Sequence, residues 1–136
     1  MSKIILAKSA GFCFGVSRSV KIAEQELKSG KCFSLGPLIH NESVVRNLEN
    51  QGLLVINSPE EAVPGSRVII RAHGVSESEI ESIKNKGAKV IDATCPYVKK
   101  IHEIVEEASK LGKHVIIIGE KEHPEVNGIY GRCNSA

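Results

Sequence analysis

From residue 9 to residue 16 the chain reads Ser9-Ala10-Gly11-Phe12-Cys13-Phe14-Gly15-Val16. The apolar run at 4–7 predicts a buried strand before this segment, and apolar residues at helical spacing predict a helix after it. Cys13 therefore lies on a predicted strand-to-helix turn, where the neighbouring glycines let the backbone approach another group closely. The positive end of a helix dipole favours a thiolate there, which suits nucleophilic attack or metal ligation. The alternative is a buried thiol that only fills space.

Length and composition indicate a soluble globular protein. The 136 residues are enough for one ordinary domain, and 41% are hydrophobic while 25% are charged. A net charge of +2 gives no reason to expect nucleic acid or an anionic membrane as a partner. The first residues predict a strand rather than a signal peptide, and no stretch is long enough to span a bilayer. We therefore expect a cytoplasmic protein whose four cysteines are reduced.

Predicted strands and helices alternate along the chain, which is typical of an α/β protein with parallel sheets and right-handed crossovers. Asn41 is a predicted helix cap, and Ser76 with Glu79 forms a predicted capping box. The chain breaks off where another strand is due, so we expect one complete lobe at 1–95 and the incomplete beginning of a second at 96–136. The predicted strands occupy 4–7, 32–36, 53–56, 68–71, 89–93 and 114–119.

Ligands of open α/β sheets bind beyond the carboxyl ends of the strands. The reactive residues that follow predicted strands are Cys13, His40, His73, Cys95, His123 and Glu125. Two thiolates at helix N-termini suit zinc or an iron–sulfur cluster, or one of them suits nucleophilic catalysis. Imidazoles close to helix N-termini suit a phosphate or diphosphate group.

The remaining candidates have simpler interpretations. Cys32 begins a predicted strand and Cys133 lies in the last segment, so we interpret both as packing residues. His102 on a helix face and His114 at the start of a predicted strand are assigned structural roles. Asp92 precedes the turn that carries Cys95, where it is expected to cap the helix or orient a neighbour.

Five motifs occur in an order that resembles the 4-hydroxy-3-methylbut-2-enyl diphosphate reductase family, also called the LytB/IspH family. Two positions depart from many of its members, which carry a small residue in place of Phe14 and serine in place of Arg71. Both positions neighbour functional residues without replacing them. The motifs are Gly11-Phe12-Cys13 to Val16, Ile39-His40-Asn41, Ala72-His73-Gly74-Val75, Asp92-Ala93-Thr94-Cys95-Pro96 and His123-Pro124-Glu125-Val126-x-Gly128.

The resemblance implies a protein of three α/β lobes around a central [4Fe–4S] cluster, with one cysteine ligand from each lobe. Cys13 and Cys95 match the first two ligands, whereas Cys133 does not match the third. The third cysteine, a threonine and a Ser-x-Asn diphosphate-binding motif belong to later parts of the family sequence, which is roughly twice as long as this chain.

The implied reaction is a two-electron reductive dehydroxylation of 4-hydroxy-3-methylbut-2-enyl diphosphate to isopentenyl and dimethylallyl diphosphate, in the methylerythritol phosphate route to isoprenoids. An external donor such as ferredoxin, flavodoxin or an NAD(P)H-linked system would supply the electrons. The resemblance implies that Glu125 feeds protons with His123 beside it. His40, His73 and His123 would hold the diphosphate, whose charge they offset best when protonated. On this reading the chain alone is inactive.

Two other classes of function stay open from the residues. The first is a zinc-binding or redox-sensing module that uses Cys13, Cys95 and the strand-end histidines. The second is a thiol enzyme with Cys13 as its nucleophile. A zinc protein would be colourless and an iron–sulfur protein brown, whereas a thiol enzyme would be inactivated by alkylation of one cysteine without any need for iron.

Overall fold

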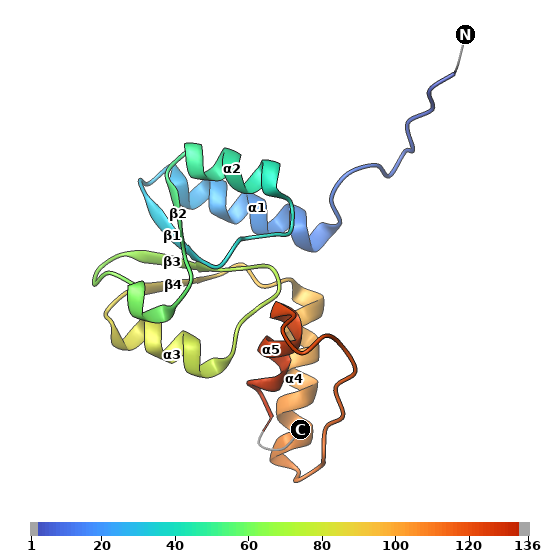
Figure 1. Ribbon diagram of the computed structural model, residues 1–136, viewed down its shortest axis with the longest axis vertical. Coiled ribbons are helices and arrows are strands. Elements are labelled where there is room, and N and C mark those ends of the chain that lie inside the picture. The colour runs from blue at the N-terminus through green and yellow to red at the C-terminus, as the bar shows by residue number, and fades with distance from the viewer. Residues whose placement is uncertain (1–2, 134–136) are drawn as a thin grey trace.

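A computed structural model describes residues 3–133, which form a parallel β-sheet with helices on both of its faces (Figure 1). Within these residues the sheet has four strands in the order β2-β1-β3-β4, and every neighbouring pair is parallel. The predicted α/β class with a parallel sheet is therefore confirmed. The strands are β1 (Cys32–Leu35), β2 (Leu53–Ile56), β3 (Arg67–Ile70) and β4 (Lys89–Asp92). The helices are α1 (Phe14–Leu27), α2 (Glu42–Asn50), the 3₁₀ turn η1 (Pro59–Glu61), α3 (Glu77–Asn85), α4 (Pro96–Lys110) and α5 (Pro124–Tyr130).

The two faces of the sheet bury separate apolar clusters. On β3, Ile69 belongs to the cluster under α1 and α2, whereas Val68 and Ile70 belong to the cluster under α3. This alternation follows from the two-residue period of a strand. Cys32 is fully buried in the first cluster, and burial raises the pKa of its thiol, as expected for a packing residue.

The helices begin at the residues that the sequence predicts. The Asn41 side chain accepts a hydrogen bond from the Val44 N–H at 3.1 Å, and Ser76 with Glu79 forms a reciprocal capping box at the start of α3. These caps satisfy N–H groups that have no partner within the helix. They fix where α2 and α3 leave the loops that follow β1 and β3, which are the loops that carry His40 and His73.

The strands predicted at 4–7 and 114–119 are wrong. Residues 4–7 are exposed and residues 114–119 are exposed or partly exposed, with Ile4 at 95% and Ile118 at 96%, and neither segment pairs with the four strands. Figure 1 shows the first segment leading away from the body and the second running back beside α4. An apolar run becomes a strand only when another strand accepts its backbone hydrogen bonds, and the part of the chain described here offers none to these two segments.

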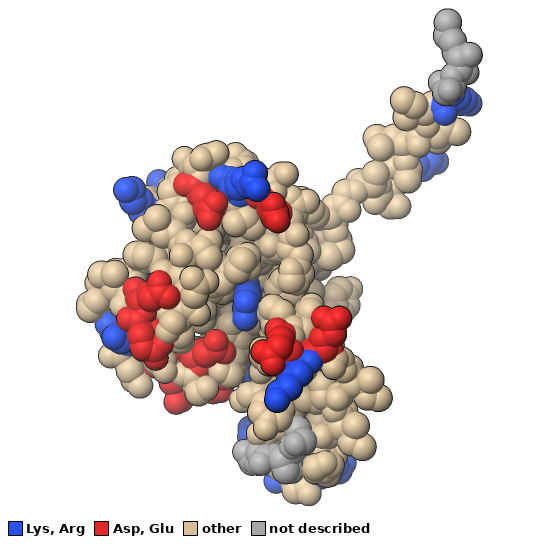
Figure 2. Space-filling model, viewed as in Figure 1, with Lys and Arg blue, Asp and Glu red and all other residues tan. Residues whose placement is uncertain are grey.

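Charges of both signs are interspersed over the face seen in Figure 2. This arrangement agrees with the small net charge of +2. Among residues 3–133, no helix is both long enough and apolar enough to cross a membrane.

Candidate functional site

Two thiols lie at the N-termini of neighbouring helices. Cys13 is the N-cap of α1 and Cys95 the N-cap of α4, and neither side chain makes a capping hydrogen bond. Both are free cysteines, with Cys13 exposed and Cys95 partly exposed. Cys95 Sγ occupies the space that a Cβ on Gly15 would need, so only glycine at this position allows the first turn of α1 to contact the thiol. The structure thus brings the start of α1 against Cys95, as the sequence predicts.

Hydrogen bonds hold α1 against the turn that precedes Cys95. Ser19 Oγ donates to the Ala93 carbonyl at 2.6 Å, and an Arg18 guanidinium nitrogen donates to the Thr94 carbonyl at 3.1 Å. Ser19 is fully buried, which makes its hydrogen bond costly to break. The two thiol-bearing helix starts are therefore held together by buried polar contacts as well as by packing.

Asp92 shapes the same turn from the end of β4. Its carboxylate accepts a hydrogen bond from the Thr94 N–H at 3.0 Å and pairs with Lys99 of α4 at 2.9 Å. Burial acts to raise the pKa of Asp92, but the hydrogen bonds from Thr94 and Lys99 outweigh it and lower the pKa overall. The predicted role of Asp92 in orienting this turn is confirmed.

Three imidazoles gather beside the thiols. The ring centroids of His40 and His73 lie 4.3 Å apart, and that of His123 lies 5.5 Å from His40 and 6.0 Å from His73. His40 follows β1, His73 follows β3 and His123 caps α5. The Cys95 N–H donates to the Ala72 carbonyl at 2.9 Å, so the turn that carries Cys95 is hydrogen-bonded to the loop that carries His73.

The cap of α5 fixes the tautomer of His123. The Glu125 N–H donates to His123 Nδ1 at 3.2 Å, so neutral His123 carries its proton on Nε2. Nε2–H is then the hydrogen-bond donor that the His123 ring can offer to a ligand bound beside the three imidazoles. Glu125 lies in the first turn of the same helix.

His73 is uncharged at neutral pH. Burial is the main cause that lowers its pKa to about 4, and His40, Arg71 and His123 lower it further. Its Nδ1 is buried and has no hydrogen-bond partner within the described residues. A bound anion would stabilise the protonated imidazole and therefore raise this pKa. His73 is thus suited to gain a proton when a negatively charged ligand binds.

Close backbone packing holds α5 in place. A Cβ on Gly128 would lie 3.5 Å from the His73 carbonyl oxygen and 3.4 Å from His102 Nε2. His102 itself is 4% exposed and lies against Gly74, so its predicted structural role agrees with its position. Arg132 then ties the end of α5 to Glu77 of α3 and Glu106 of α4, at 2.7 and 2.6 Å. These contacts position His123 and Glu125 over the loop that carries His73.

Sequence reasoning misplaced or missed several residues. His123 and Glu125 follow no strand and instead begin α5, and His114 lies in an exposed segment rather than at a strand start. The close approach that the sequence predicts for the glycines beside Cys13 is confirmed at Gly15, where Cys95 Sγ occupies the space of a Cβ. Arg132 carried no local signal, because its ion pairs join segments far apart in the sequence.

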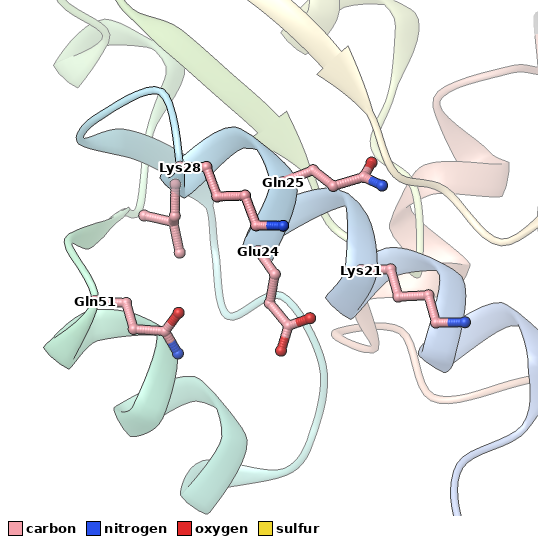
Figure 3. Close-up of a pocket in the computed structure, with 6 residues that line it drawn as sticks. Lys21, Glu24, Gln25, Lys28 and Gln51 are labelled. Carbon is pink, nitrogen blue, oxygen red and sulfur yellow. The ribbon is translucent and has the colours of Figure 1, made fainter.

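The groove between α1 and α2 is separate from this site (Figure 3). Its volume is about 610 Å³, and it follows the C-terminal half of α1, away from Cys13. It contains neither thiol nor imidazole, and we assign it no chemistry. The lining residues are Lys21, Glu24, Gln25, Leu27, Lys28 and Gln51.

The donor set limits what this chain can bind by itself. Within residues 3–133, no three His, Cys, Asp or Glu side chains lie together in a way that would hold a metal ion. Cys13 and Cys95 fit as two thiolate ligands of an iron–sulfur centre, because both are free and both lie at helix N-termini. A complete centre would need further ligands from outside this group.

The comparison of sequences and the comparison of structures find similarity to the same kind of protein. The chain is 50% identical to the 4-hydroxy-3-methylbut-2-enyl diphosphate reductase of Aquifex aeolicus, over 98% of this chain and 48% of the relative. It is 46% identical to the reductase of the same name from Caldanaerobacter subterraneus, over 96% of this chain and 47% of the relative. The chain thus spans about half the length of the curated relatives that it matches.

Solved structures of such reductases share the fold. One, described as (E)-4-hydroxy-3-methyl-but-2-enyl diphosphate reductase, the terminal enzyme of the non-mevalonate pathway, is 49% identical with a TM-score of 0.82, over 99% of this chain and 50% of that one. The Plasmodium falciparum reductase is 37% identical with a TM-score of 0.88, over 92% of this chain and 40% of that one. The family model described as LytB protein matches residues 4–136. The chain therefore belongs to the LytB protein family.

Proposed function

We propose that this chain is the N-terminal part of a 4-hydroxy-3-methylbut-2-enyl diphosphate reductase. The reaction replaces an allylic hydroxyl by hydrogen, consumes two electrons and two protons, and releases water, giving isopentenyl and dimethylallyl diphosphate in the methylerythritol phosphate route. The observation that carries the proposal is the cluster of three imidazoles, whose His73 loop accepts a backbone hydrogen bond from Cys95, the free thiol that lies against the start of α1. On this proposal residues 1–95 make the first lobe and 96–136 begin the second.

Cys13 and Cys95 would hold a [4Fe–4S] cluster, with the third thiolate supplied by a part of the protein outside this chain. Such a cluster supplies electrons and, with one iron free of thiolate, a Lewis acid for the substrate hydroxyl. The helix N-termini favour the thiolate forms that ligation requires. Gly15 lets the first turn of α1, which begins after Cys13, lie directly against Cys95.

His40, His73 and His123 would bind the diphosphate. His123 offers Nε2–H, because its Nδ1 is occupied by the cap of α5. His73 starts neutral, since its pKa is about 4 without a ligand, and it gains a proton when an anion approaches. Proton uptake on binding then offsets part of the substrate charge.

Glu125 would deliver a proton to the allylic fragment. It lies two residues from the cap His123, on the helix that Gly128 and Arg132 hold against the His73 loop. This placement would keep a carboxyl on the same short helix as the imidazole that binds the substrate. The electrons would come from an external donor such as ferredoxin, flavodoxin or an NAD(P)H-linked system. Four free cysteines are compatible with a reducing compartment such as the cytoplasm.

The test is anaerobic purification of the full-length protein, followed by metal analysis and turnover of the allylic diphosphate with a reduced donor. We expect iron and acid-labile sulfide, a brown colour and both isomeric products. Zinc in place of iron, without turnover, would support the binding-module alternative. Turnover that is abolished by alkylation and does not need iron would support the thiol-enzyme alternative.

A further inference from the structure

Arg71 is a partly buried cation that forms no ion pair within residues 3–133. It follows β3 directly, and its Nε is buried with no hydrogen bond among the residues that the structure describes. Burial lowers the pKa of its guanidinium, which shows that the charge has lost part of its hydration. A buried charge of this kind is unfavourable unless something pairs with it.

The other arginines in the described part of the chain are all paired. Arg18 donates to the Thr94 carbonyl, Arg46 pairs with Glu42, Arg67 with Glu26, and Arg132 with Glu77 and Glu106. Arg71 therefore stands apart from the four arginines whose roles are accounted for by contacts within the fold.

Arg71 lies on the turn after β1 and two residues before His73. One guanidinium nitrogen lies 2.6 Å from where a Cβ on Gly36 would be, so the side chain rests on the turn that leads from β1 toward His40. Its positive charge acts on His73, where it contributes to the lowered pKa. Glu79, whose charge acts on Arg71, instead accepts hydrogen bonds from the Ser76 N–H and hydroxyl at 2.8 and 2.7 Å.

We propose that Arg71 is the permanent cation of the diphosphate site and that its guanidinium binds a phosphate oxygen beside His40, His73 and His123. This inference rests on the proposed function. A guanidinium suits the role because its fork of N–H donors matches phosphate oxygens and because it keeps its charge at any physiological pH. Neutral imidazoles alone would offer N–H donors but no fixed charge, so Arg71 supplies the long-range attraction.

The test is calorimetric binding of inorganic diphosphate to this chain at pH 7, for wild type, Arg71→Met, Arg71→Lys and the exposed control Arg46→Met. We expect the Met variant at position 71 to bind roughly 10- to 100-fold more weakly, the loss of one charge-assisted hydrogen bond or more. Arg71→Lys keeps the charge but not the fork and should lose less. Arg46→Met should bind like wild type, because Arg46 pairs only with Glu42 on the surface of α2.

A second measurement separates electrostatics from a merely structural role. In Arg71→Met the pKa of His73, followed by NMR without ligand, should rise, whereas Arg71→Lys should leave it low. Equal binding by wild type and Arg71→Met would overturn the inference while leaving the proposed function intact. No diphosphate binding by wild type would overturn the assignment of the imidazoles as well. Should Arg71→Met not fold, Arg71→Gln is the neutral variant, and binding equal to wild type would again overturn the inference.

Discussion

Cys13 and Cys95 differ from the other two cysteines in where the chain places them. The first two cap helices with free thiols, whereas Cys32 is fully buried in the core and burial raises the pKa of Cys133. In the full-length protein, Cys13→Ser and Cys95→Ser should each reduce the iron content and abolish turnover. Cys32→Ser is the matched control and should do neither. Iron analysis and anaerobic assay decide this, and equal iron loss in all three variants would contradict the assignment.

Glu125 is expected to act through its proton. In the full-length protein, Glu125→Gln keeps the size of the side chain and removes the acid, so iron content and substrate binding should persist. Turnover should fall roughly 10²–10⁴-fold, the usual range for a positioned proton donor. The exposed neighbour Glu122 provides the control Glu122→Gln, which should be near wild type. Anaerobic rates and the isomer ratio test this, and near-normal turnover in Glu125→Gln would remove Glu125 from the proton path.

His73 should make the stability of the fold depend on pH. The unfolded imidazole binds a proton near pH 6.5, whereas the folded one does so near pH 4, because burial and three cationic or titratable neighbours lower its pKa. The unfolded state therefore holds more protons between these values, and the free energy of unfolding falls as the pH drops from about 6.5 to about 4. Urea unfolding of wild type and His73→Gln across this range measures it. The variant should show a shallower decline, and parallel curves would contradict the prediction.

The helices and strands show which parts of the fold could be predicted from the sequence. Helix starts were predictable because Asn41 and Ser76 each cap an N–H group only three residues away. The segments 4–7 and 114–119 have equally clear apolar patterns, but a strand also depends on a distant partner that the pattern does not reveal. The same division holds for the site. The thiols and imidazoles lie in local motifs, whereas the burial of Arg71 and the ion pairs of Arg132 depend on segments brought together only by folding.

The contact between α1 and the start of α4 depends on Gly15, which has no Cβ. Gly15→Ala would push a Cβ into Cys95 Sγ, so α1 must shift or the thiol must turn away. We expect a loss of about 1–3 kcal/mol in stability from overpacking, together with reduced iron content in the full-length protein. Lys21→Ala, on the exposed side of the same helix, is the control and should change neither. Thermal unfolding and iron analysis measure both effects, and full iron content in Gly15→Ala would show that the close contact is dispensable.

On the proposed function, this chain supplies only some of the ligands that the complete site needs. The thiols and imidazoles meet at one end of the sheet, and the chain covers only 48% of its Aquifex relative. Two thiolates also provide only part of the metal-binding free energy that would stabilise the folded loops around a complete centre. After anaerobic reconstitution with iron and sulfide and then desalting, the isolated chain should therefore retain no stable four-iron cluster and show no reductase activity. Iron analysis and a visible spectrum test this, and a stoichiometric four-iron cluster on this chain alone would show that the site needs no further ligand.

The strand order also has a consequence for the sequence of events during synthesis. β1 is made first but lies between β2 and β3, and β4 joins last, at the edge beside β3. The turn that carries Cys95 leaves β4, and its backbone bonds to the Ala72 carbonyl form only when that edge is complete. A nascent chain therefore exposes Cys13 long before Cys95 has a place to dock. A metal centre that used both thiols could therefore be completed only after the chain had been synthesised past β4 to Cys95.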